Sequence, residues 1–94
     1  MYTYNEKKIL YTYLSNIFQY IDNNNENDVN LCNDIINIIK NYKENSKYYT
    51  LNNSVYNIIF NNLSDDTIDD IFDYLINEKN IIDSKENFLT QYSI

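Results

Sequence analysis

The chain has 94 residues, of which 44% are hydrophobic and 16% aromatic, and its 14 acidic residues outnumber 7 lysines to give a net charge of −7. This hydrophobic content excludes a disordered chain, and the length predicts one small domain over residues 1–94. The negative charge argues against direct binding to nucleic acid or to an anionic membrane, because both would repel it.

Several residue types are absent: the chain contains no Gly, Pro, Ala, Arg, His or Trp. The abundant types, Asn, Ile, Tyr, Asp and Lys, have AT-rich codons, which indicates the genome of a low-GC bacterium, of one of its phages or plasmids, or of an AT-rich virus. Without Gly, left-handed backbone at helix ends falls mainly to Asn. No apolar run approaches the length of a membrane span, so we expect a soluble, cytoplasmic protein in its host cell.

The first predicted helix covers residues 5–21. Its apolar residues recur at i, i+3 and i+4, and with the tyrosines they cover about 200° of the helical wheel, twice the usual stripe. Such a wide arc predicts either a central helix or a helix with one flank against another chain. Residues 22–27 are a loop by composition.

A second helix is predicted over residues 28–42, with Cys32 as a small buried hydrophobic residue, and a connection over 44–53 contains the pair Tyr48-Tyr49. A short third helix is predicted over 54–62, with Val55, Ile58 and Ile59 pointing inward. Strands are an alternative at 47–51 and at 80–83.

The fourth helix is the clearest, with Ser64 as its N-cap and an end near Lys79. Asn80 to Asp83 breaks it, and Asp83 to Glu86 has the spacing of a capping box for a last short helix. The predicted class is therefore all-α, a compact bundle of four helices plus a short C-terminal helix.

The fourth helix contains two overlapping Asp-Asp-x-x-Asp patterns, at residues 65–69 and 69–73. On a helix, Asp66, Asp69, Asp70 and Asp73 share one face. The pattern resembles the aspartate-rich motif of isoprenoid synthases, which implies magnesium held over a diphosphate. A chain of this size cannot enclose such a substrate, and basic clamps for the diphosphate are missing, so we reject this function.

Other chemistry has little support. Asp22, Asn24 and Glu26 resemble the first ligands of an EF-hand calcium loop, but Asn33 stands where a bidentate Glu is needed. The chain has no His to act as a general base near neutral pH. We therefore expect no enzyme activity, no cofactor and no metal.

The acidic face is better interpreted as an interaction surface, with a merely solvated face as the alternative. Its like-charge i, i+4 pairs each cost about 0.2–0.5 kcal/mol, and no Lys lies one turn away. Tyr is also enriched at protein interfaces. The predicted partner-binding residues are Asp66, Asp69, Asp70, Asp73, Tyr74, Tyr48 and Tyr49.

The leading hypothesis is a small acidic inhibitor that mimics nucleic acid and covers a basic surface of a partner protein. Many phage anti-CRISPR proteins are similar in size and charge. Acidic four-helix immunity proteins also carry a Tyr-Tyr pair, so a bacteriocin immunity or antitoxin protein is the first alternative. The second is a self-associating structural protein, a homodimer through the first helix.

Overall fold

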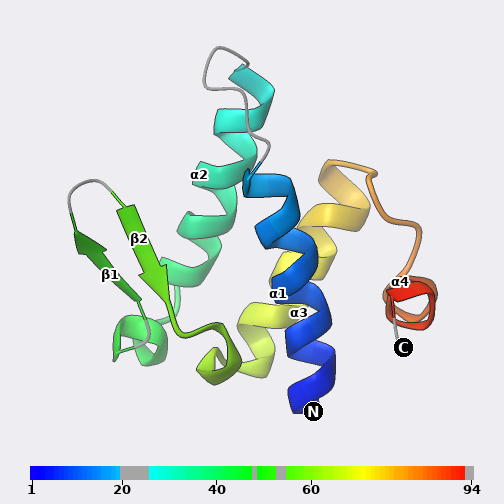
Figure 1. The fold of residues 1–94 in the computed structure, drawn as a ribbon, viewed down its shortest axis with the longest axis horizontal. Helices are drawn as coiled ribbons and strands as arrows, with labels where there is room; N and C mark the ends of the chain where they lie inside the picture. The colour runs from blue at the N-terminus through cyan, green and yellow to red at the C-terminus, as the bar shows by residue number, and fades with distance from the viewer. Residues whose placement is uncertain (20–25, 48, 53–54, 93–94) are drawn as a thin grey trace.

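Two amphipathic helices open the chain in the computed structural model, which describes residues 1–19, 26–47, 49–52 and 55–92. Helix α1 spans Tyr4–Gln19 and α2 spans Glu26–Lys40, so both predicted helices are confirmed with shifted ends (Figure 1). A capping box starts α1, because the Thr3 hydroxyl accepts from the Glu6 N–H at 3.1 Å and the Glu6 carboxylate accepts from the Thr3 N–H at 2.9 Å. Most of the predicted loop 22–27 lies outside the described residues.

A β-hairpin stands where a third helix was predicted. After the 3₁₀ turn η1 (Lys43–Lys47), β1 (Tyr49–Asn52) pairs antiparallel with β2 (Val55–Ile58), and the 3₁₀ turn η2 (Phe60–Asn62) follows. The helix prediction for 54–62 was wrong, because apolar residues at helical spacing over so few positions also suit a strand rich in β-branched residues and Tyr. The strand alternative near 47–51 is confirmed by β1, whereas residues 80–83 form no strand.

The fourth predicted helix is present but changes its winding. Helix α3 spans Asp65–Asp73 and continues as the π-helical turn η3 (Tyr74–Glu78), whose bond runs from the Lys79 N–H to the Tyr74 carbonyl. Asn80 then has a φ of 53°, and this left-handed turn lets the Ile81 N–H reach the Leu75 carbonyl. Asn therefore takes the position that Gly occupies in most proteins.

The last helix, α4, spans Lys85–Tyr92. Its N-cap is Ser84, whose hydroxyl accepts from the Asn87 N–H at 3.1 Å, one residue later than the predicted capping box at Asp83. Among the described helices, none is both long and apolar enough to span a bilayer.

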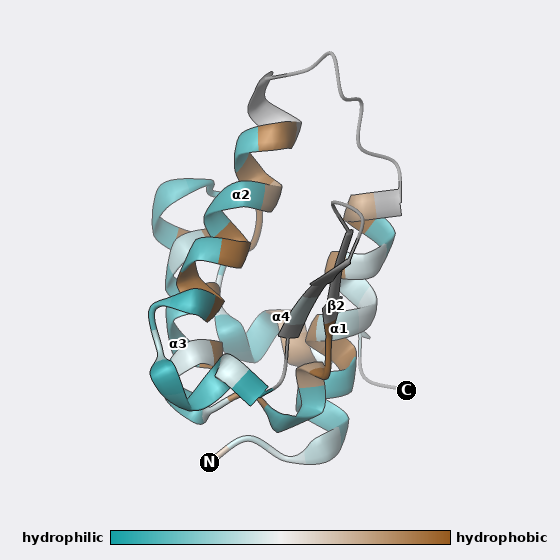
Figure 2. Ribbon diagram, turned by 90° about the vertical axis from the view of Figure 1, so that its left-hand side faces the viewer, coloured by the Kyte–Doolittle hydropathy of each residue, from teal (hydrophilic) through white to brown (hydrophobic). Residues whose placement is uncertain are grey.

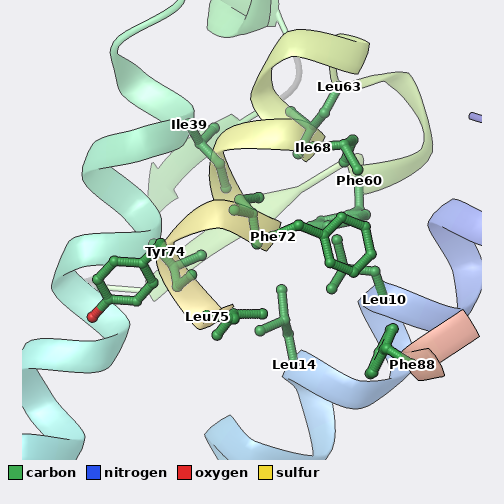
Figure 3. Packing of buried hydrophobic residues seen from close by; sticks show 12 residues of the cluster. Leu10, Leu14, Ile39, Phe60, Leu63, Ile68, Phe72, Tyr74, Leu75 and Phe88 are labelled. Atoms are coloured by element: carbon green, nitrogen blue, oxygen red, sulfur yellow. The ribbon is translucent and has the colours of Figure 1, made fainter. Parts of the chain in front are cut away.

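The hydrophobic core lies where α1, α2, α3 and α4 meet η2. Figure 3 shows its side chains converging from these elements, with Phe72 of α3 beside Leu10 of α1 and Phe88 of α4 below them. Helix α2 turns its apolar side inward (Figure 2). The radius of gyration is 13.0 Å, typical of a compact chain of this length. The buried hydrophobic residues are Leu10, Leu14, Ile35, Ile39, Phe60, Leu63, Ile68, Ile71, Phe72, Tyr74, Leu75 and Phe88.

Two predicted core positions were wrong. Cys32 is half-buried, because it lies beside the inward-facing stripe of α2. Ile59 is 56% exposed, since the hairpin replaces the helix that would have turned it inward. On α1, Tyr4 and Tyr11 are also exposed, which leaves one flank of this helix open.

A buried polar network joins α2, η1 and α3. The side-chain amide of Asn45 donates to the Ile39 carbonyl at 2.9 Å and to the Thr67 hydroxyl at 2.7 Å, and its oxygen accepts from the Ser64 N–H at 3.3 Å. Asn45 and Thr67 are both fully buried. The network thus satisfies a carbonyl at the end of α2 and an N–H at the start of α3, which fixes the two helices relative to each other.

Candidate functional site

The Asp-rich helix α3 begins as the sequence predicts. The Ser64 hydroxyl accepts from the Thr67 N–H at 3.2 Å, and Asp65 and Asp66 follow in the first turn, where the helix dipole favours negative charge. Thr67, Ile68, Ile71 and Phe72 bury the opposite face. The acidic face is therefore a direct consequence of burying the apolar one.

The N-terminal segment contacts one edge of the acidic face. The backbone N–H of Tyr2 donates to Asp65 at 3.2 Å, and the Tyr2 hydroxyl donates to Asp69. The Tyr2 ring stacks on Phe72, with 5.9 Å between ring centres. Burial, followed by the hydrogen bond to Asp69, raises the pKa of Tyr2 above its usual value.

Two lysines from other helices approach the same edge. The Nζ atom of Lys7 in α1 lies 3.9 Å from the Asp65 carboxylate, and the Nζ atom of Lys85 in α4 lies 3.9 Å from the Asp69 carboxylate. The ammonium of Lys85 also lies 5.1 Å from the centre of the Tyr2 ring. The like-charge repulsion inferred from the sequence is thus relieved here by segments that are distant in the chain. Asp65 and Asp69 are therefore occupied by contacts that hold the fold together.

The opposite edge of the acidic face meets α2. Asp70 accepts a hydrogen bond from the Tyr42 hydroxyl, and this bond, more than burial, raises the pKa of Tyr42 to about 12. The Tyr74 ring points from η3 toward α2 (Figure 3), where its hydroxyl donates to Asp34 at 2.7 Å. Burial, and then this bond, raise the pKa of Tyr74. In a chain without Arg, tyrosine hydroxyls take the role of donors to aspartate.

An open groove of about 440 Å³ lies along this edge, between α2 and the α3–η3 segment. We call it the acidic groove. Its walls carry carboxylates from both sides, none of its lining residues is a Lys, and Ile38 supplies apolar surface. The Tyr74 ring is buried, and the ammonium of Lys79 lies 5.8 Å from its centre. The lining residues are Asp34, Asn37, Ile38, Asn41, Asp70, Asp73, Tyr74, Asn77 and Glu78.

Two carboxylates of the acidic face have no hydrogen-bonding partner in the part of the chain that is described. Asp66 and Asp73 are exposed, and within residues 1–19, 26–47, 49–52 and 55–92 neither forms a hydrogen bond or an ion pair. Asp73 lines the acidic groove, and Asp66 lies one turn before Asp70. These two side chains, with the groove, form the candidate site.

The predicted site residues thus lie in different parts of the molecule. Asp70, Asp73 and Tyr74 meet at the acidic groove, whereas Asp69 lies on the other edge with Tyr2. Tyr48 and the side chain of Tyr49 lie outside the described residues. Sequence reasoning missed Asp34 and Glu78, which complete the groove, because no local pattern relates a carboxylate on α2 to Tyr74.

The described residues contain no group of three or more His, Cys, Asp or Glu side chains placed to hold a metal ion. The residues compared with an EF-hand loop lie mostly outside the described part. No protein-family model, curated protein or solved structure matches the chain.

Proposed function

We propose that the protein is a small inhibitor whose acidic groove, together with Asp66, covers a basic surface of a partner protein that otherwise binds nucleic acid. The observation that carries the proposal is the division of the aspartates. Asp65, Asp69 and Asp70 have partners within the fold, whereas Asp66 and Asp73 are exposed and unpaired in the described residues.

The charge of the groove suits a cationic partner. Asp34, Asp70, Asp73 and Glu78 surround a concave surface on a chain whose net charge is −7. A cleft lined by one sign of charge focuses the electric field and raises the rate of association with an oppositely charged partner. The groove therefore favours a surface rich in Lys or Arg.

The shape of the site also suits long basic side chains. The apolar surface of Ile38 can pack against the methylene stem of a Lys or Arg, while the carboxylates meet its charged end. From Asp66 to Asp73, the helix rises by roughly 10 Å, which places carboxylates at a spacing comparable with that of phosphates along a nucleic acid. The protein would then compete with nucleic acid for the same basic groove.

The test compares two variants that lose the same charge at different places. Asp66→Asn with Asp73→Asn removes two carboxylates from the candidate site, and Asp83→Asn with Glu86→Gln removes two exposed carboxylates from the loop before α4 and the start of α4. Immobilised wild-type protein would capture partners from a host lysate, and mass spectrometry would identify them. The Kd of the captured protein would then be measured for each variant, with and without a labelled duplex that the partner binds.

We expect the site variant to bind at least tenfold more weakly, a loss of about 1.4 kcal/mol, and the matched control to bind nearly as the wild type does. The wild type should also displace the duplex from the partner. Equal affinity of the two variants, or a captured partner whose duplex binding is unaffected, would contradict the proposal. A captured toxin that binds no nucleic acid would favour the immunity alternative.

A further inference from the structure

The outer edge of the hairpin is unpaired. Strand β1 pairs with β2 on one side, and no third strand joins this sheet in the part of the chain that the structure describes. Figure 1 shows β1 at the outside of the molecule, with no element beyond it, and β2 on the side of α1. Every second residue of such an edge strand directs its N–H and C=O away from the hairpin, where they can pair with another strand.

The usual protection of a strand edge is missing. Natural proteins block edges with charged side chains, above all Lys, or with Pro. The stretch from residue 48 to residue 64 contains neither a charged residue nor Pro, in a chain that is otherwise rich in charge. The exposed Thr50 on β1 is an uncharged residue with high β-propensity. The edge of β1 is therefore suited to strand pairing.

The sheet has two strands in the described part of the chain. An isolated pair of strands is only marginally stable, and further strands or packing against a helix are needed for a stable sheet. The hairpin packs against the core through Ile58 at the end of β2, whereas Thr50 on β1 is exposed. Additional strands would supply the pairing that this hairpin lacks.

We propose that β1 pairs antiparallel with β1 of a second copy of this chain, which joins the two hairpins into a four-stranded sheet and forms a homodimer. Two identical antiparallel strands obey a two-fold axis, so the same edge serves both copies. The charges also favour this face over the acidic groove. The residues that lead into β1 include Lys43, Glu44 and Lys47, all exposed, so the lysines outnumber the one carboxylate, and no other carboxylate follows until Asp65. Two copies of net charge −7 thus meet where their carboxylates are sparse.

This dimer is independent of the proposed function. The acidic groove lies between α2 and the α3–η3 segment, whereas the hairpin edge lies outside the helical part of the molecule (Figure 1). Each dimer would carry two acidic grooves open to partners. Loss of the dimer would not change the effect of the Asp66 and Asp73 substitutions on partner binding. Neutralising Asp66 and Asp73 would in turn leave the dimer intact.

The experiment measures mass by sedimentation velocity from about 1 to 300 μM protein, because an interface of small area is expected to be weak. Thr50→Lys introduces the charge that blocks edges in other proteins, and Thr50→Val is the matched uncharged control. We expect the wild type and Thr50→Val to dimerise and Thr50→Lys to dimerise at least tenfold more weakly. In the wild type, hydrogen exchange at residues 49–52 should slow as the protein concentration rises and the dimer forms.

A wild-type protein that remains monomeric over this range would overturn the proposal. A second variant, Ile59→Asp, tests the open flank of α1, where Tyr4, Tyr11 and Ile59 are exposed around a groove of about 260 Å³. If Ile59→Asp abolishes the dimer while Thr50→Lys leaves it unchanged, the copies meet through α1 and the strand-pairing proposal is wrong. Circular dichroism of each variant confirms that the helices are retained.

Discussion

Removing the Asn45 side chain should destabilise the protein, because Asn45 is one of the two buried polar residues in the described part of the chain. Asn45 is fully buried, and it donates to the Ile39 carbonyl and the Thr67 hydroxyl while accepting from the Ser64 N–H. Each hydrogen bond contributes about 0.5–1.5 kcal/mol net, so Asn45→Ala should lower the free energy of unfolding by about 2–4 kcal/mol. The total for a chain of this length is only about 5–14 kcal/mol.

The assay is urea unfolding followed by circular dichroism, with thermal melts in parallel. A loss of 2–4 kcal/mol should lower the Tm by about 10–30 °C in so small a protein. Asn45→Asp keeps the shape but loses the amide donors and places a charge in the core, so it should cost at least as much. Ser46→Ala, at an exposed neighbouring position, is the control and should change stability by less than about 0.5 kcal/mol. A loss for Asn45→Ala as small as that of the control would refute the reasoning.

Three further outcomes follow from single contacts. Tyr2→Phe keeps the ring but removes the donor to Asp69, and we expect a loss of about 1 kcal/mol in urea unfolding; no loss would show that this bond does not hold the N-terminal segment. The bond to Asp70 raises the pKa of Tyr42 from 10.0 to about 12, so the folded state holds the hydroxyl proton more tightly than the unfolded chain does. This bond therefore stabilises the fold fully below pH 10, and the stabilisation is lost as the pH rises to about 12. Tyr42→Phe should therefore lose less stability over that interval than the wild type, and equal losses would contradict the assignment. Asn80 has a φ of 53°, so in thermal melts Asn80→Gly should raise the Tm and Asn80→Ala should lower the stability by about 1 kcal/mol. The reverse order would rule out a strained left-handed residue at this position.

The helices could be predicted from the sequence because their signals are local. The spacing of apolar residues predicted α1, α2 and α3, and Ser64, a residue type favoured at the N-cap, predicted where α3 begins. The prediction that Asn replaces Gly at left-handed positions is confirmed at Asn80. These features depend on contacts within about one helical turn, so a single chain segment contains all the information they need.

The hairpin and the π-helical turn could not be predicted in the same way. The segment at 54–62 has apolar residues at a spacing that suits a short helix, and its pairing with β1 decides the outcome. In η3, the change from α to π winding follows no break in the pattern of residues 74–78. Both features depend on the elements packed around them.

The candidate site shows the same division. The acidic face itself was determined by the sequence, because burying Ile68, Ile71 and Phe72 leaves the aspartates of α3 on the outside. Only the tertiary structure decided which aspartates are occupied. Tyr2 and Asp69 lie 67 residues apart in the chain, and Tyr74 and Asp34 lie 40 apart. Such distant pairs form only when the folded core holds their helices together, and they leave Asp66 and Asp73 as the carboxylates of this face that are available to a partner.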